Sequence, residues 1–363
     1  MLRLAVELLS MSSSVSEIQD RESFERLSER QAINCPVCGG PCTDLPLYRY
    51  TVEQAAAHFC PPTRDTHRNR RLQHCIAGLW QGNDCEIFAC ARCGFGFGHP
   101  FVGGDEEFYS ILHEQRAYPA WRWDYDVAIT QAVRKFEGGK ILDVGAGSGV
   151  FLRRLETNWQ VFAVEGSELT RVELEHDGIQ VLRGLGVALK SHANQFRVIT
   201  LFQVLEHIAD FEEMLRQCHA LLEPGGHLVV TVPDGDAMIR QERVTGCHDM
   251  PPNHINKWTP ESLSLVMRRV GFECATPIYE PPSWKNVKAN LHMRMIAEAA
   301  KGDTVAAQIY RIRNRRFRFA ALSFLGVPTM LRMFRYGRQL RLGGAFAIVG
   351  VVPAQHRDKA RNK

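Results

Sequence analysis

The sequence lacks several features that would assign it to a special class of protein. No apolar run reaches the ~18–20 residues needed to span a bilayer, and the best candidate, residues 319–331, contains Pro328. No repeat recurs at a solenoid period. The N-terminal MLRLAVELLS carries Glu7 and makes a poor secretory signal, so we expect a cytosolic protein. With 363 residues, 45% of them hydrophobic and 23% charged, the chain is not mainly disordered, collagen-like or a coiled coil. The length suggests two or three domains.

Acidic residues are scarce in the C-terminal part of the chain. Residues 301–363 contain 14 Lys/Arg and 2 Asp/Glu, a net charge of +12, whereas the other 300 residues have a net charge of −8. In RIRNRRFRF and LRMFRYGRQLRLGG, arginine alternates with aromatic residues. Three interpretations stay open: a solvated helical insertion, a helix that contacts an anionic membrane surface or a lipid-linked acceptor, and an RNA-binding face. The arginines from 311 to 318 are too closely spaced to share one helical face, which argues against the membrane interpretation.

Cysteine is scarce outside one segment, since eight of the eleven cysteines lie between Cys35 and Cys93. A disulfide scaffold would need a short secreted chain, so the clustering indicates metal. The pairs in CPVCGG and CARCGFGF each place glycine after the second cysteine, where backbone N–H groups must reach sulfur. Four thiolates suit a structural zinc ion, so we predict a zinc site of Cys35, Cys38, Cys90 and Cys93. The 51 residues between Cys38 and Cys90 exceed the gap of a compact zinc ribbon and require an insertion. A redox role for one CxxC pair is the alternative.

From about residue 116, short apolar segments alternate with amphipathic segments of helix length. KILDVG, WQVFAVEG, GIQVLRG, FRVITLF and GHLVVTVP are predicted as strands, apolar on both faces as in a buried parallel sheet. The pattern predicts an α/β fold, a doubly wound sheet with helices on both faces. The chain then divides into a polar segment (1–30), a zinc-binding module (31–115), a core (116–285), a basic helical insertion (286–340), the last strand of the core (341–353) and a tail (354–363).

A glycine loop follows the first strand of the predicted core. In KILDVGAGSGVFLRRL the strand leads to Gly145, Gly147 and Gly149 and then to a predicted helix. Glycines let the backbone turn sharply and approach a ligand, and a helix N-terminus offers free N–H groups. A nicotinamide dinucleotide would also suit such a loop, but Val150 replaces the third small residue of that fingerprint. An acid, Asp143, also lies two residues before the first glycine.

ILDVGAGSG, VEGS and FRVITLFQVLEHIADFEEMLRQCHALLEPGGHLVVTVPD together resemble the class I S-adenosylmethionine-dependent methyltransferases, and more narrowly their ubiquinone-biosynthesis O-methyltransferase branch. The resemblance covers about residues 116–285 and the last strand, and implies a Rossmann-like fold with S-adenosylmethionine as cofactor. It also implies that Glu165, which ends the second strand, binds ribose, and that the LLEPGG turn is structural. Two departures are Phe196-Arg197 where the family often has Phe-Asp, and the lack of an acid after the third strand for adenine. The implied cofactor contacts are Asp143, Gly145, Ala146, Gly147, Glu165, Gly166, Phe202 and Gln203.

Methyl transfer from a sulfonium needs acceptor, methyl and sulfur in line, and a hydroxyl acceptor needs a base. Histidine is the usual base near neutral pH. His254, in the loop PPNHIN, is our first candidate; Glu206 and His207, at the predicted C-terminal edge of the sheet, are further candidates, and His248 is a weaker one. In some relatives a Glu-x-x-Glu-His pattern binds a divalent ion here, but Gln203 replaces the first glutamate, which argues against a catalytic metal.

The segment before the core resembles the connector of bacterial family members that carry an N-terminal zinc-binding module. Its aromatic residues Tyr118, Trp121, Trp123 and Tyr125 predict a helix that either covers the pocket or packs between domains. We therefore predict a methyltransferase that modifies a hydroxyl of a small molecule or glycan and carries structural zinc. The alternatives are an rRNA or tRNA methyltransferase and a non-catalytic, cofactor-binding zinc scaffold. The oligomeric state stays open.

Overall fold

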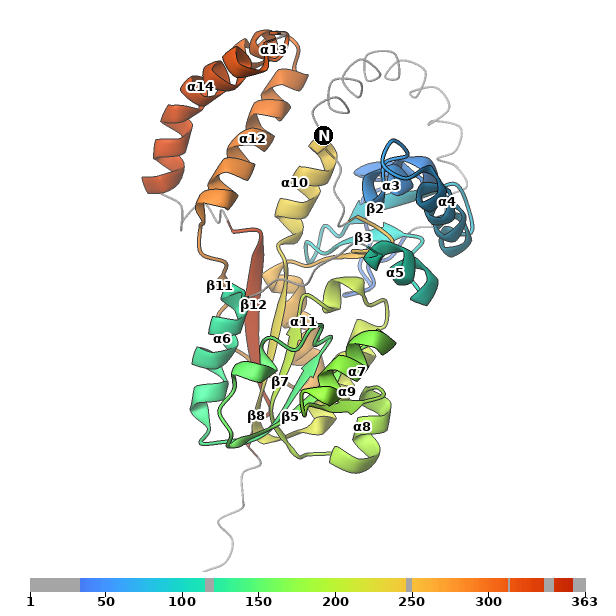
Figure 1. Ribbon diagram of the computed structural model, residues 1–363, viewed down its shortest axis with the longest axis vertical. Coiled ribbons are helices and arrows are strands. Elements are labelled where there is room, and N and C mark those ends of the chain that lie inside the picture. Colours follow the sequence, from blue (N-terminus) through green and yellow to red (C-terminus); the bar gives the residue numbers. More distant parts are fainter. Residues whose placement is uncertain (1–32, 115–120, 246–249, 313, 336–342, 355–363) are drawn as a thin grey trace, which may run out of the picture.

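The computed structural model describes residues 33–114, 121–245, 250–312, 314–335 and 343–354 (Figure 1). The polar segment 1–30, Tyr118 and His248 lie outside these residues, so the predictions made for them are not addressed below. Two sheets organise the rest of the chain, one with eight strands and one with four.

The larger sheet has the strand order β10-β12-β8-β7-β4-β5-β6, and β11 also pairs with β12. Strands β4 to β8 are parallel, and β12 runs antiparallel to β8. The chain moves outward from β4 to β6 and then returns to β7 on the other side of β4, which creates a switch point where α/β folds bind ligands. The strands are β4 (Gly139–Val144), β5 (Trp159–Val164), β6 (Gln180–Leu182), β7 (Phe196–Phe202), β8 (Leu222–Pro233), β10 (Glu273–Cys274), β11 (Ile278–Tyr279) and β12 (Ala345–Val351).

Helices cover both faces of this sheet, as the alternating pattern predicted. Leu142 and Val144 of β4 join the apolar core on one face, whereas Ile141 joins the core on the other. This alternation follows from the two-residue period of a strand. The first core contains α8 (Leu185–His192), α9 (Phe211–Leu221) and α11 (Pro260–Val270), and the second contains α6 (Trp123–Gln131) and α7 (Glu168–His176). The predicted parallel α/β sheet and its five strands are confirmed.

One local prediction in the core was wrong. The helix predicted after the glycine loop is only a 3₁₀-helix, η3 (Leu152–Arg154), because β5 already begins at Trp159 and leaves a short connection. The shortened connection means that no α-helix N-terminus follows the glycines. The LLEPGG segment, predicted as a structural turn, is mostly part of β8, where an irregularity in the pairing with β7 absorbs the extra residues.

The smaller sheet is antiparallel and joins two distant parts of the chain. Its order is β1-β2-β3-β9, and β9 follows β8 by more than twenty residues in the core segment. The helix predicted in YTVEQAAAHF is confirmed as α3, with Thr51 as its N-cap. The elements are β1 (Tyr48–Thr51), β2 (Asp84–Ala89), β3 (Gly96–His99), β9 (Asn256–Lys257), α3 (Val52–Phe59), α4 (Thr66–Trp80) and α5 (Glu106–His113).

A buried ion pair fixes this junction. Lys257 Nζ lies 2.8 Å from Glu242 Oε1 on α10 (Gly235–Thr245), and both side chains are fully buried. The Tyr48 hydroxyl donates to the other oxygen of Glu242 at 2.7 Å. Residues from β1, β9 and α10 therefore form one buried polar network. This network holds the cysteine-rich segment against the core.

A helical hairpin extends from the larger sheet between β11 and β12 (top of Figure 1). It consists of α12 (Trp284–Ala300), α13 (Val305–Tyr310) and α14 (Arg315–Arg335) and has a small core of its own around Met295, Ala299 and Ala306. The prediction of basic helices before the last strand is confirmed for the residues described here. None of the helices in the described part of the chain is long and apolar enough to cross a membrane.

Candidate active site and cysteine cluster

The glycine loop lies where β4 and β5 end. Gly145 and Gly147 have φ values of 75° and 52°, in the region that favours glycine. A Cβ atom at Gly145 would come within 2.6 Å of Val204 Cγ2, so a side chain there would meet the segment after β7. Glu165 accepts hydrogen bonds from Gly147 N at 2.8 Å and from Ser167 N at 3.0 Å. These contacts hold the acid at the end of β5 against the loop.

Other predicted cofactor residues line the same edge. Ala146 N donates to Val164 O at 3.4 Å, and Gly166 follows Glu165 in the turn before α7. Phe202 ends β7 and packs against Tyr125 of α6, with ring centroids 4.8 Å apart. The structure thus brings the predicted cofactor residues together at the C-terminal ends of β4, β5 and β7.

Asp143 is a buried carboxylate beneath the loop. The Thr200 hydroxyl donates to its Oδ1 at 2.7 Å. Burial raises the pKa of Asp143 to about 7, although the Thr200 hydrogen bond and the Arg122 guanidinium favour the charged form. The position therefore holds an acid that changes its charge near neutral pH and that a cationic ligand would ionise.

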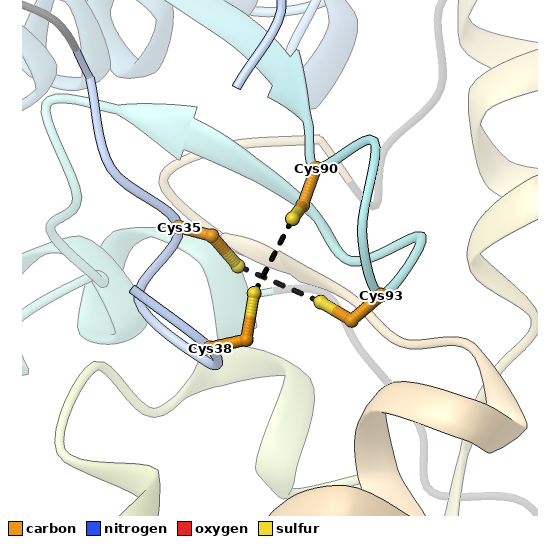
Figure 2. Close-up of side chains that lie close together, drawn as sticks. All are labelled: Cys35, Cys38, Cys90 and Cys93. Atoms are coloured by element: carbon orange, nitrogen blue, oxygen red, sulfur yellow. Dashed lines mark hydrogen bonds between the residues drawn. The ribbon is translucent and has the colours of Figure 1, made fainter. Parts of the chain in front are cut away.

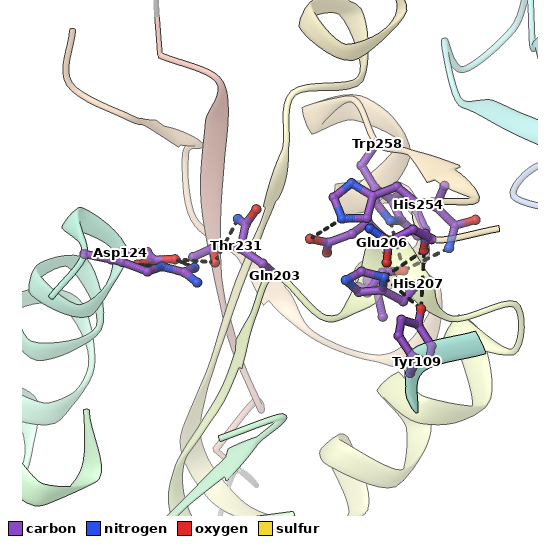
Figure 3. Close-up of polar contacts among 12 residues, drawn as sticks. Tyr109, Asp124, Gln203, Glu206, His207, Thr231, His254 and Trp258 are labelled. Carbon is purple, nitrogen blue, oxygen red and sulfur yellow. Dashed lines mark hydrogen bonds and ion pairs between the residues drawn. The ribbon is translucent and has the colours of Figure 1, made fainter. Parts of the chain in front are cut away.

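A polar network that the sequence analysis missed lies beside these residues (Figure 3, left). Arg122 forms an ion pair with the fully buried Asp124 at the start of α6. Thr231 donates to Asp124 Oδ2 at 3.0 Å, and Gln203 Nε2 donates to Thr231 Oγ1 at 3.4 Å. Gln203 has a φ of 58°, a conformation that costs about 1 kcal/mol or more and is concentrated at functional sites. The only sequence signal for this network was the charge pattern WRWDYD.

The predicted catalytic residues form a second group at the end of β7 (Figure 3, right). Glu206 and His207 belong to the 3₁₀-helix η4 (Leu205–His207), and His254 comes from the loop before β9. The two imidazole rings meet edge-on with centroids 4.5 Å apart. His254 Nε2 lies 4.0 Å from Oε1 of the buried Glu206. Residues 47 positions apart in the sequence are thus neighbours in the fold.

The contacts of His207 determine which of its nitrogens carries the proton. Nδ1 lies 2.7 Å from the carbonyl oxygen of Asn253. A carbonyl only accepts hydrogen bonds, so Nδ1 carries a proton, and in the neutral ring Nε2 then has the lone pair. The Tyr109 hydroxyl of α5 lies 3.1 Å from the same Nδ1 and donates to Asn253 O at 3.5 Å. His207 is thereby oriented with Nε2 as its basic nitrogen.

Tyr109 and Asn253 were not found from the sequence. Tyr109 belongs to the connector before the core, where only the later aromatic residues were expected to cover the pocket, and Asn253 acts through its backbone. The close approach of this segment is also visible at Gly103, where a Cβ atom would come within 2.5 Å of His207 O. The cysteine-rich segment therefore contributes to the candidate active site itself.

Glu206, His207 and His254 are also close enough to hold one metal ion, since one ligand atom from each lies within 4.8 Å of the others. Two imidazoles and one carboxylate suit zinc or another transition metal better than magnesium, which prefers oxygen ligands. Gln203, at the position of the glutamate that is lost, donates instead to Thr231, in the network beside Asp124. The predicted residues at this place therefore supply at most three ligands to a metal ion.

The four predicted cysteine ligands converge in space (Figure 2). Cys35 Sγ lies 3.7 Å from Cys93 Sγ, and Cys38 Sγ lies 3.4 Å from Cys90 Sγ. Tetrahedral zinc with bonds of about 2.3 Å would hold its sulfurs about 3.8 Å apart. Burial raises the pKa of the Cys93 thiol to about 11. At Cys90 the effect of burial is outweighed by hydrogen bonds from the backbone N–H groups of Cys93 and Arg92, which bring the pKa down to about 7.

Both cysteine turns use glycine as predicted, and both contact the core. Gly39 and Gly94 have φ values of 65° and 72°. The carbonyl of Cys93 accepts a hydrogen bond from Thr259 Oγ1 at 3.1 Å, and Arg269 of α11 donates to the carbonyl of Val37 at 2.8 Å. The donor set and the sulfur separations fit a zinc ion, and the cluster connects the cysteine-rich segment to α11.

Comparison with known proteins shows which proteins the core resembles. Residues 118–276 match the model of a family described as a methyltransferase domain. The ubiquinone biosynthesis O-methyltransferase of Marinobacter nauticus is 25% identical over 160 residues, which cover 38% of this chain and 64% of the relative. That of Yersinia pestis is 32% identical over 104 residues, which cover 24% and 40%. The match therefore spans less than two thirds of each of these two relatives.

Among solved structures, a SAM-dependent methyltransferase from Archaeoglobus fulgidus is similar, with a TM-score of 0.40 and 16% identity over 68% of this chain and 100% of that one. The match to the methyltransferase domain model covers residues 118–276, less than half of the chain. The glycine loop, Glu165, Glu206, His207 and His254 all lie within it.

Proposed function

We propose that this chain is an S-adenosylmethionine-dependent O-methyltransferase. Its acceptor is a hydroxyl of a small molecule or glycan. One observation carries the proposal: the glycine loop with Glu165 lies on one side of the sheet's switch point, and an oriented histidine lies on the other at the end of β7. The names of the relatives support a hydroxyl acceptor. The comparisons favour neither the RNA methyltransferase nor the non-catalytic scaffold.

The residues at the glycine loop fit the chemical groups of this cofactor. Glu165 would accept hydrogen bonds from the ribose hydroxyls, and the backbone of residues 145–147 would lie against the methionine part. Asp143 would face the positive charge of the cofactor, which would favour its ionised form. Arg122, within electrostatic reach of Asp143, provides a cation for the cofactor's carboxylate.

When bound, the cofactor would supply a methyl group attached to a positively charged sulfur. This sulfur is a good leaving group because it becomes a neutral thioether. His207 Nε2 would take the proton of the acceptor hydroxyl as the methyl group passes from the sulfur of the cofactor to the acceptor oxygen. The products are a methyl ether, the thioether and a proton, which the imidazole passes to solvent. Asn253 and Tyr109 hold His207 in the required tautomer. Glu206 and His254 provide a second carboxylate–imidazole pair beside it.

We therefore place His207 ahead of His254 as the base, which reverses the order drawn from the sequence. A metal ion held by Glu206, His207 and His254 would instead act as a Lewis acid that lowers the pKa of the acceptor hydroxyl. Metal analysis distinguishes these mechanisms, because EDTA would also remove zinc from the cysteine cluster. One metal ion per chain supports the histidine base, whereas a second ion that Glu206→Gln removes without loss of the first indicates the metal.

Calorimetry with S-adenosylmethionine, followed by mass spectrometry of products from a panel of hydroxylated acceptors, tests the proposal. We expect Glu165→Ala to weaken cofactor binding at least about tenfold, because it removes the ribose acceptor. His207→Asn should lower kcat about 100-fold or more with unchanged cofactor affinity, and Tyr109→Phe should lower it less. A protein that does not bind the cofactor, or a His207→Asn variant with normal kcat, would refute the proposal.

We also propose that Cys35, Cys38, Cys90 and Cys93 bind structural zinc. Sulfur separations near those of a tetrahedral site support this, as do the two turns whose backbone N–H groups contact the thiols of Cys35 and Cys90. We propose a cytosolic location, where such thiols would stay reduced.

A further inference from the structure

Helix α14 exposes a row of large apolar side chains. Phe317, Phe324 and Leu331 are 71%, 83% and 63% exposed. They are spaced by seven residues, or about two helical turns, so they lie on one side of the helix. At about 1.5 Å per residue the row is about 21 Å long. We name these three residues the apolar ridge.

The ridge points away from the hairpin's own core. Gly326, half a turn from Phe317 around the helix, faces α12, because a Cβ atom there would come within 2.7 Å of Leu291 Cδ2. Leu322 packs against the same small core. The side of α14 that stabilises the hairpin is therefore opposite the ridge, and the ridge residues contribute little to this packing.

Arginine residues flank the ridge. Arg316 and Arg318 lie about 100° to either side of Phe317 on the helix, and Arg311 is exposed where α13 ends. The close spacing of the arginines argued against one helical face in the sequence, but the run is divided, since α13 ends at Tyr310 and α14 begins at Arg315. Residues 301–335 contain eight Lys/Arg and one Asp. An apolar face with a basic border is typical of helices that lie in a membrane interface.

We propose that the apolar ridge docks α14 on an anionic membrane surface. Phe317, Phe324 and Leu331 enter the boundary between head groups and acyl chains, while the flanking arginines contact anionic lipid. A second copy of the hairpin would bring like charges together. RNA bases stack on aromatic rings, so an RNA would leave Leu331 without a suitable contact. The hairpin connects β11 to β12, and just before β12 the Gly344 carbonyl accepts a hydrogen bond from Asp234 N, at the end of β8, at 2.9 Å. Docking would therefore orient the C-terminal edge of the sheet toward the bilayer.

Sedimentation of the full-length protein with vesicles tests this inference, which does not depend on the proposed methyl transfer. We expect binding to phosphatidylcholine vesicles that contain phosphatidylglycerol. Binding should be at least about tenfold weaker to phosphatidylcholine alone, and it should fall steeply with added NaCl. The variant Phe317→Ser/Phe324→Ser should lose about tenfold or more of the binding, because two exposed rings no longer enter the lipid.

Leu169→Ser/Val172→Ser is the matched control, since it removes two exposed apolar side chains from α7, away from the hairpin. It should bind vesicles as the unmodified protein does, and circular dichroism should show both variants folded. The inference is wrong if the full chain does not bind anionic vesicles, or if the α7 variant loses as much binding as the α14 variant. It is also overturned if the ridge substitutions abolish self-association or RNA binding while vesicle binding is unchanged.

Discussion

Asp143 is an acid whose charge is set by its surroundings. Burial raises its pKa to about 7, while Thr200 and Arg122 only partly oppose this rise. In the protein without ligand, the carboxyl is therefore half protonated near neutral pH. A ligand with positive charge at this position favours the ionised form, so its binding must release a proton wherever Asp143 is still protonated.

We therefore predict that affinity for S-adenosylmethionine falls as the pH decreases through 7. The raised pKa means that Asp143 is protonated below 7, and protonation removes the attraction for the cofactor's positive charges. Between pH 8 and pH 6 the dissociation constant should increase about tenfold. Calorimetry in matched buffers measures this. Asp143→Asn should bind S-adenosylmethionine weakly, and its dissociation constant should change with pH only as the ionisation of the ligand itself requires. If the dissociation constant of the wild-type protein changes with pH in the same way as that of the variant, the prediction is wrong.

At the candidate site, the sequence predicted residues that act through side chains within a recognisable motif. Glu206, His207 and His254 were found because they follow a strand or lie in a His-bearing loop. Tyr109 was missed because it lies in another segment and reaches His207 only after the smaller sheet has formed. Asn253 was missed because a backbone carbonyl leaves no signal in residue type. Contacts of these two kinds depend on tertiary structure and cannot be deduced from spacing.

Among the elements, strands were predicted more reliably than connections. The central strands of the larger sheet are mostly apolar on both faces, so the pattern indicates burial on both faces. The connection after the glycine loop has too few residues for the predicted helix. Strand β9 could not be predicted at all, since it has only two residues, Asn256 and Lys257, and a polar sequence. Its extended conformation comes from pairing with β3, a partner far away in the chain.

The ion pair of Lys257 on β9 with Glu242 on α10 makes this junction sensitive to substitution. Lys257→Met should lower the free energy of unfolding by about 3–5 kcal/mol, because it leaves the buried Glu242 carboxylate without its cation. The double variant Lys257→Met/Glu242→Leu should recover part of this loss, since it removes both buried charges. Urea unfolding followed by circular dichroism measures both values.

An exposed ion pair in the smaller sheet provides the control for this prediction. Arg49 Nη1 lies 3.3 Å from Asp84 Oδ2, and both side chains are exposed. Arg49→Met should cost less than about 1 kcal/mol, because water screens an exposed pair. Equal losses for Arg49→Met and Lys257→Met would show that burial of the Lys257–Glu242 pair does not matter for stability.

For the whole molecule, the cysteine cluster connects metal binding to the candidate active site. The cluster contacts Thr259 and Arg269 in the core, and the segment that follows it carries Tyr109 to His207. The cofactor residues belong to the larger sheet and do not depend on this connection. Loss of the metal should therefore affect the acceptor side of the site more strongly than the cofactor side.

We predict one zinc ion per chain, lost in Cys35→Ser, because the remaining three thiols no longer close a tetrahedral site. The variant should be less stable and should lower kcat about tenfold or more, while affinity for S-adenosylmethionine stays within about twofold, since Glu165 and the glycine loop lie in the larger sheet. Metal analysis, turnover and calorimetry measure the three effects.

Cys42→Ser is the matched control, because Cys42 lies beside Cys90 but outside the cluster, and it should keep its zinc. A folded, zinc-free wild-type protein would refute the site, and an equal loss of cofactor affinity and kcat would show that the cysteine-rich segment supports the whole domain rather than the acceptor side.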